Sequence, residues 1–128
     1  PSLLSSLNGA VIKALCELLE IDVRLVSGAG LGPSGASTQL LIDLTKAVGG
    51  TTYLSGEGGR LYQDEALYRE AGVELRFQEF QHPEYEQRCA EFLPGLSVFD
   101  ILCCSGLEWT RQFLQESRER FVNTSTLS

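Results

Sequence analysis

The fold is decided by residues 51–77, which read TTYLSGEGGRLYQDEALYREAGVELRF. Thr51–Leu54 and Val73–Phe77 are short runs rich in β-branched and aromatic residues, a composition typical of strands. Between them, Asp64–Ala71 fits a short helix whose first residue is suited to cap it and which Gly72 would end. A strand, a helix and a second strand in this order predict a right-handed crossover between two parallel strands.

The same alternation extends in both directions along the chain. Residues 3–19 carry apolar side chains at helical spacing, and Ile21–Val26 fits a short buried strand. A helix with Ser37 or Thr38 as its cap is expected next, and helices over Ser97–Cys103 and Gly106–Phe121 are expected to close the chain. The helical stripe at the start consists of Leu4, Leu7, Val11, Leu15 and Leu18.

This order of elements predicts an α/β fold, a small three-layer sandwich with a mostly parallel sheet of about three strands and Rossmann-like topology. The length of 128 residues suits one domain, expected over residues 1–121, with a disordered tail over 122–128. The edges of so small a sheet need cover, which favours an amino-terminal partner domain or a homo-oligomer.

Charge narrows the classes of partner. The net charge is −7, and no Lys or Arg block supplies the basic face that nucleic acid or an anionic membrane requires. Arg111, Arg118 and Arg120 alternate with acids and are typical of a solvated helix face. The chain contains no apolar run long enough to span a bilayer and no signal-peptide pattern, so we expect a cytoplasmic protein.

The four cysteines predict reduced thiols that fill apolar sites, because two of them are adjacent and the chain is large enough to fold without bridges. With a single His and no CxxC pair, no metal site is expected. Two nucleotide-binding patterns begin in residues 28–37, but Pro33 breaks one and Ala36 replaces the lysine of the other. The sequence therefore specifies no cofactor.

Ligands of open parallel sheets bind at the carboxyl ends of the strands. The loop after Leu54 contains three glycines that could form a backbone anion nest, and Arg60 could pair with a phosphate or carboxylate. A purely structural turn is the alternative. His82 follows the last strand and is a candidate general acid or base, with Tyr85 placed to orient it. The three loop glycines are Gly56, Gly58 and Gly59.

Four blocks, in this order and spacing, resemble the bacterial WbqC-like family: residues 51–62, 72–75, 78–85 and 92–100. The resemblance covers most of residues 1–106, and the chain is similar to the carboxyl half of the longer family members. It implies a role in surface-polysaccharide or specialised-metabolite biosynthesis. It also directs attention to Ser55, Tyr62 and Asp100, beside Arg60, His82 and Tyr85.

Together these features predict part or all of a transferase, of acyl or glycosyl-precursor type, that binds a small anionic ligand at the carboxyl edge of the sheet. Arg60 and the glycine backbone would hold the anion, while His82 would exchange a proton with an amine or hydroxyl. The alternative is a non-catalytic ligand-binding or protein-interaction module.

Overall fold

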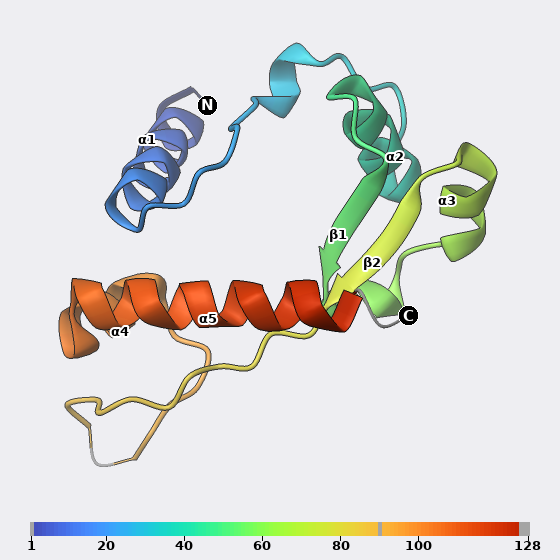
Figure 1. Cartoon of the computed structure of the whole chain (residues 1–128). Coiled ribbons are helices and arrows are strands. Elements are labelled where there is room, and N and C mark those ends of the chain that lie inside the picture. Colours follow the sequence, from blue (N-terminus) through green and yellow to red (C-terminus); the bar gives the residue numbers. More distant parts are fainter. Residues whose placement is uncertain (1, 90, 126–128) are drawn as a thin grey trace. The chain divides into compact units, whose positions relative to one another are not determined.

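A computed structural model describes residues 2–89 and 91–125, with side chains described for 3–89 and 91–119 (Figure 1). The chain divides into two compact units: unit 1 comprises residues 1–25 and 81–128, and unit 2 comprises Val26–Phe80. Its elements are α1 (Ser2–Leu18), α2 (Ser37–Ala47), β1 (Thr52–Gly56), α3 (Glu65–Ala71), β2 (Glu74–Gln78), α4 (Val98–Ser105) and α5 (Leu107–Ser125). Two 3-10 turns, Gly28–Gly30 and Glu57–Leu61, complete them.

Unit 2 is built around the predicted strand–helix–strand segment. β1 and β2 pair in parallel, with Thr52 opposite Glu74 and Gly56 opposite Gln78. Parallel neighbours need a crossover connection, and α3 provides it. These elements confirm the small α/β class, although the sheet of the described chain has two strands instead of about three.

The core of unit 2 lies on one face of this sheet. Ile42 of α2, Tyr68 of α3 and Val73 are buried together, and Tyr53 and Leu75 pack against them from the strands. Strand side chains alternate between the two faces of a sheet, so every second residue of β1 and β2 lies on the opposite face, where its side chain is exposed. This face carries Thr52, Leu54, Glu74 and Arg76. Unit 2 is therefore a two-layer arrangement, and the second helical layer of the expected sandwich is not formed within it.

Local signals placed α3 correctly. The Asp64 side chain accepts a hydrogen bond from the Ala66 amide at 2.9 Å, which satisfies a donor at the start of the helix. Gly72 ends the helix in the left-handed conformation, with φ 67°, where a residue without Cβ is favoured.

The predicted cap of α2 is wrong. Ala36 occupies the cap position and makes no side-chain capping bond. Thr38 is buried instead, and its hydroxyl accepts a hydrogen bond from the Asp64 amide at 3.2 Å. The hydroxyl thus joins α2 to the start of α3, a contact between residues 26 positions apart that local sequence does not reveal.

The strand predicted over Ile21–Val26 is not formed. These residues are not part of the sheet, and Ile21, Val23, Leu25 and Val26 are all exposed. An apolar, β-branched segment becomes a strand only when a neighbouring strand pairs with its backbone. The sheet described here offers it no such partner.

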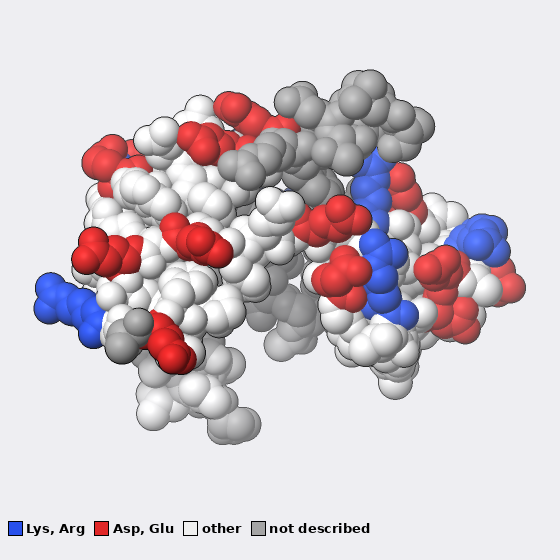
Figure 2. Space-filling model, turned by 90° about the horizontal axis from the view of Figure 1, so that it is seen from below, with Lys and Arg blue, Asp and Glu red and all other residues white. Residues whose placement is uncertain are grey.

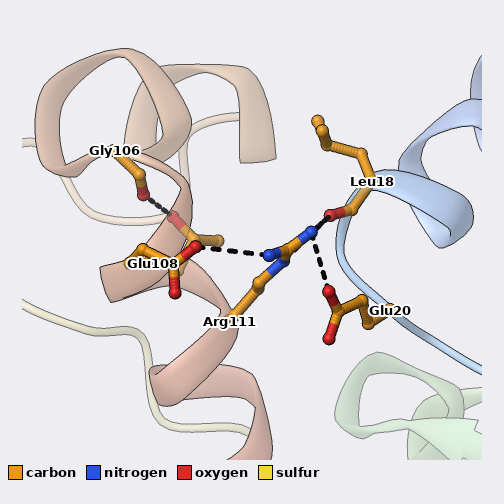
Figure 3. Close-up of polar contacts among 6 residues, drawn as sticks. Leu18, Glu20, Gly106, Glu108 and Arg111 are labelled. Atoms are coloured by element: carbon orange, nitrogen blue, oxygen red, sulfur yellow. Dashed lines mark hydrogen bonds and ion pairs between the residues drawn. The ribbon is translucent and has the colours of Figure 1, made fainter.

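In unit 1, Arg111 of α5 binds the carboxyl end of α1 (Figure 3). Its Nε and Nη2 donate to the Leu18 carbonyl oxygen at 3.0 and 2.8 Å. Glu20 and Glu108 pair with the same guanidinium at 3.0 and 3.3 Å. A cation at the end of a helix satisfies its unpaired carbonyls and its negative dipole. Arg111, predicted to belong to a solvated helix face, therefore also holds the end of α1, and its side chain stays 27% exposed.

None of the helices in the described residues is long and apolar enough to cross a membrane. On the face drawn in Figure 2, Lys and Arg side chains lie among Asp and Glu side chains. Helix α5 continues to Ser125, and residues 126–128 of the expected tail lie outside the described part of the chain.

Candidate functional site

The carboxyl ends of β1 and β2 lie side by side in unit 2. The register places Ser55 opposite Phe77, and the turn Glu57–Leu61 follows β1 directly. Arg60, in that turn, places its guanidinium carbon 4.3 Å from the centre of the Phe77 ring. Two segments far apart in sequence thus bring a cation and an aromatic face together at the sheet edge where ligands of parallel sheets bind.

Arg60 also forms an ion pair within its own turn. Its Nε lies 2.7 Å from Glu57 Oε1, and both side chains are about half exposed. An exposed pair of this kind contributes only ~0.2–1 kcal/mol. The pair uses Nε alone, so both terminal amino groups of Arg60 lack a protein partner among the described residues.

A groove of about 340 Å³ opens beside this guanidinium. It combines two arginines, two glutamates and an apolar floor. Glu74 is already engaged, because Thr52 and Arg76 donate to its carboxylate at 2.9 and 2.8 Å and these hydrogen bonds hold its pKa below the usual value. The lining residues are Arg60, Glu65, Tyr68, Arg69, Val73, Glu74, Leu75 and Phe77.

The loop glycines do not form the expected nest. A nest needs alternating right- and left-handed residues, and Gly56, Gly58 and Gly59 all lack a positive φ. Gly56 and Gly58 border open space. At Gly59, by contrast, a Cβ would overlap the hydroxyl of Ser55, so this glycine is required by packing.

Ser55 is buried, and its hydroxyl is fully used inside unit 2. Gln63 Nε2 donates to Ser55 Oγ at 2.7 Å, and Ser55 Oγ donates to the Gly56 carbonyl at 3.0 Å. The side-chain oxygen of Gln63 is buried without a hydrogen-bond partner among the described residues. Tyr62, another candidate, is exposed.

The other candidates belong to unit 1. Tyr85 Oη donates to Asp100 Oδ2 at 2.7 Å, and Gln87 Nε2 reaches the same oxygen at 3.3 Å. This bond to the Asp100 carboxylate raises the pKa of Tyr85. Asp100 sits in the first turn of α4, which Ser97 caps through the Phe99 amide.

A cavity of about 530 Å³ opens beside Asp100. All four cysteines are free thiols, as predicted, but Cys89 and Cys103 are exposed rather than buried in apolar sites. They line this cavity because the loop before α4 and the α4 helix face one another across it. Within the described residues, His, Cys, Asp and Glu side chains form no group of three or more that could hold a metal ion. The lining residues are Gln87, Arg88, Cys89, Leu96, Asp100, Cys103 and Cys104.

His82 is exposed in unit 1, beside the turn at Gly95. A Cβ on Gly95 would lie 3.8 Å from His82 Cε1. The structure therefore joins Tyr85 to Asp100, and it gathers Arg60 with the glycine loop, but these two groups belong to different units.

Sequence reasoning missed Phe77, Gln63, Gln87 and Arg69 as neighbours of the candidates. The alternation of Leu75 and Phe77 in β2 with Val73 just before it was the available signal for Phe77, because alternate strand residues share a face. No comparable local pattern marks Gln63 or Gln87.

Comparisons with known proteins identify the family of the chain. No solved structure matches the chain. The uncharacterized protein Rv1507c of Mycobacterium tuberculosis is 29% identical over 106 residues, which cover 82% of this chain and 46% of that protein. The chain thus spans less than half the length of this relative. The model of the WbqC-like protein family matches residues 1–112, and the chain belongs to that family.

Proposed function

We propose that the chain is part or all of a transferase, of acyl or glycosyl-precursor type, that acts in surface-glycan or specialised-metabolite biosynthesis. Unit 2 would bind an anionic group of a substrate. The position of Arg60 at the carboxyl end of the parallel strands carries this proposal, because its terminal amino groups are free among the described residues while Phe77 and Glu57 hold its orientation.

The chemistry of the groove favours a phosphate or carboxylate attached to a larger neutral group. A guanidinium binds either anion through two parallel hydrogen bonds. The weak, exposed Glu57 pair can yield to such a ligand. Arg69 adds a second cation, while Leu75 and Phe77 offer apolar contact to the rest of the molecule. Glu65 and Glu74 would repel a ligand that is negative throughout.

The catalytic assignment rests on unit 1. His82 is exposed, so its imidazole is accessible to a substrate. Tyr85 is held by Asp100, which supports a positioning role for the tyrosine. We place the activity in the cytoplasm, because free thiols persist in reducing compartments.

A second candidate is a ligand-binding module without catalysis. It is favoured by the division of the candidates, since Arg60 belongs to unit 2 and His82 to unit 1. Under this hypothesis unit 2 binds the anion and His82 is a surface residue.

The test of the anion site is a titration of the chain with inorganic phosphate, a nucleoside diphosphate, a nucleotide sugar, an acyl-CoA and an amino acid, followed by calorimetry. Arg60→Ala should weaken binding at least ~10-fold, since a charged hydrogen-bonded pair contributes about 1.5–3 kcal/mol. Lys46→Ala is the matched control, because Lys46 is an exposed cation of unit 2 that does not line this groove. Equal losses in both variants would refute the site.

The His82→Ala variant distinguishes the two candidate functions. Once the panel names a ligand class, mass spectrometry can follow group transfer from that ligand to amine and hydroxyl acceptors. In a transferase, His82→Ala abolishes transfer and leaves the affinity for the ligand unchanged. A chain that binds ligand through Arg60 but transfers nothing, in any variant, is a binding module.

A further inference from the structure

The groove beside Arg60 contains a second arginine, Arg69, in the last turn of α3. Arg69 is exposed. Glu65 lies four residues before it, the spacing at which an acid and an arginine on one helix readily pair. No ion pair or side-chain hydrogen bond occupies the Arg69 guanidinium within residues 3–89 and 91–119. This cation is therefore available to a ligand.

The two carboxylates that line the groove differ in their partners. Glu74 is engaged, because its carboxylate accepts hydrogen bonds from Thr52 and Arg76. Glu65 is exposed, and no hydrogen bond or ion pair occupies its carboxylate in the part of the chain that the structure describes. The two arginines and Glu65 are therefore the charged groups that a ligand of this groove meets.

These three charged groups come from two segments of unit 2 that meet at the groove. Arg60 follows β1 and lies over the Phe77 ring of β2, with 4.3 Å between the guanidinium carbon and the ring centre. Glu65 and Arg69 lie about one turn apart on the same side of α3. Leu75 and Phe77 add apolar surface. The groove thus offers two cations and one carboxylate beside an apolar floor.

Two arginines in one groove favour a ligand with two adjacent anionic groups. A guanidinium binds one phosphate through two parallel hydrogen bonds, so a single phosphate requires Arg60 alone. A diphosphate presents a second phosphate to Arg69 without separating the two charges on the ligand. It therefore uses both cations of the groove at once.

Glu65 restricts what is attached to this diphosphate. An ionised carboxylate only accepts hydrogen bonds, so it repels further phosphates and binds hydroxyl groups. A sugar linked to the diphosphate carries no charge and supplies hydroxyls next to the phosphates. The volume of about 340 Å³ lies near the lower end of small-molecule sites, which span roughly 300–1,000 Å³. The groove therefore has room for a diphosphate with one attached sugar.

We propose that the groove binds the diphosphate of a sugar diphosphate, with Arg60 and Arg69 each holding one phosphate and Glu65 accepting hydrogen bonds from the sugar. This assignment rests on the proposed function, because it names the substrate class of the anion site at Arg60. Nucleotide sugars and coenzyme A both contain a diphosphate linked to a sugar, so the shared group suits either type of donor for the proposed transferase.

Calorimetry of the full chain with inorganic phosphate and inorganic pyrophosphate, in buffer that contains a metal chelator, tests the role of Arg69. The wild type should bind pyrophosphate at least ~10-fold more tightly than phosphate, because a second charged contact forms. Arg69→Ala should abolish this preference and leave the affinity for phosphate unchanged. Arg60→Ala should weaken the binding of both ligands, and Lys46→Ala should behave as the wild type.

The outcomes separate this assignment from the proposed function. A preference for pyrophosphate that survives in Arg69→Ala, or an equal loss of both ligands in that variant, overturns the diphosphate assignment while leaving the anion site at Arg60 intact. Binding that Arg60→Ala does not weaken refutes the anion site itself, and with it the assignment.

Glu65→Ala should change the affinities for two ligands in opposite directions, which a general loss of folding cannot do. The affinity for pyrophosphate should rise, because a repulsive charge is removed. The affinity for UDP-glucose should fall several-fold, because hydrogen bonds to the sugar are lost. A shift of both affinities in the same direction would contradict the role of Glu65 and overturn the assignment.

The source of the diphosphate is distinguished by comparing UDP-glucose with coenzyme A in the wild type. The type of donor that this groove accepts should bind more tightly than pyrophosphate and should lose affinity in Arg69→Ala. If neither compound binds more tightly than pyrophosphate, the groove does not recognise a sugar diphosphate and the assignment is overturned.

Discussion

Unit 2 and helix α1 are both rich in apolar residues, yet only unit 2 buries them. Ile42, Tyr68 and Val73 come from separate elements and close on one another. The leucines of α1 have an equally regular spacing, but all of them except the partly buried Leu15 are exposed. Periodicity identifies the apolar side of an element, and only contacts distant in sequence decide what covers it.

The strongest challenge to this contrast is to truncate one large side chain in each region. Tyr68 is 1% exposed, so Tyr68→Ala should lower the free energy of unfolding of unit 2 by about 3–5 kcal/mol, as for other large buried aromatics. Leu4→Ala should change it by less than ~0.5 kcal/mol. Hydrogen exchange of the β1 and β2 amides measures both effects within unit 2.

Equal loss of protection in the two variants would mean that α1 supports the core of unit 2. Fluorescence of Trp109, the single tryptophan and a residue of unit 1, provides the complementary readout for that unit.

The same contrast explains which parts of the fold could be predicted. Asp64 and Gly72 act through neighbours two to four residues away, so local sequence was sufficient for α3. Ile21–Val26 has strand composition, but a strand also needs a partner that composition does not name. Arg111 binds the carbonyl of a residue 93 positions away, and no local pattern indicates this contact.

Two adjacent glycines in the loop after β1 differ in packing, since one is enclosed by side chains and the other borders open space. Gly59→Ala places a methyl group against Ser55 Oγ and Gln63 Nε2, which are joined by a hydrogen bond. It should destabilise unit 2 by about 1–3 kcal/mol through overpacking. Gly58→Ala meets open space and should have almost no effect. Thermal unfolding followed by circular dichroism distinguishes them, and similar midpoints would contradict the packing role of Gly59.

The candidate site was predictable only in part. The predicted order of strands placed the loop containing Arg60 at the carboxyl edge of the sheet, and the turn Glu57–Leu61 does follow the end of β1. The hydrogen bond between Tyr85 and Asp100 joins residues 15 positions apart, and no periodic pattern in the sequence indicates this contact. The buried hydroxyl of Ser55 accepts a hydrogen bond from Gln63, and no sequence pattern indicates the direction of the Gln63 side chain.

Helix caps provide a smaller comparison between the two units. Asp64 caps α3 in unit 2, and Ser97 caps α4 in unit 1, each through an amide two residues ahead. Asp64→Ala and Ser97→Ala should each cost about 1 kcal/mol. Each loss of stability should appear only in the unit that carries the substitution. Hydrogen exchange of the β1 and β2 amides reports the loss from Asp64→Ala in unit 2, and Trp109 fluorescence reports the loss from Ser97→Ala in unit 1. A loss shared by both readouts would show that the units unfold together.

The smallest expected effect at neutral pH concerns the hydroxyl of Tyr68, which is buried without a hydrogen-bond partner among the described residues. Burial, followed by the nearby Tyr53 and Tyr62, raises the pKa of Tyr68 from 10.0 to about 12. Between these values the unfolded chain has lost a proton that the folded chain retains. The stability contribution is therefore complete below about pH 10 and is lost as the pH rises toward 12.

Tyr68→Phe removes this titration together with the unpaired hydroxyl. At neutral pH the variant should be as stable as the wild type or more stable by up to ~1 kcal/mol. Above pH 10 its advantage should grow, because only the wild type then loses stability through Tyr68. Denaturant unfolding of both proteins across this pH range measures the difference in stability. Parallel pH profiles would show that the Tyr68 hydroxyl is hydrated or hydrogen-bonded. The core of unit 2 would then be more open than its packing indicates.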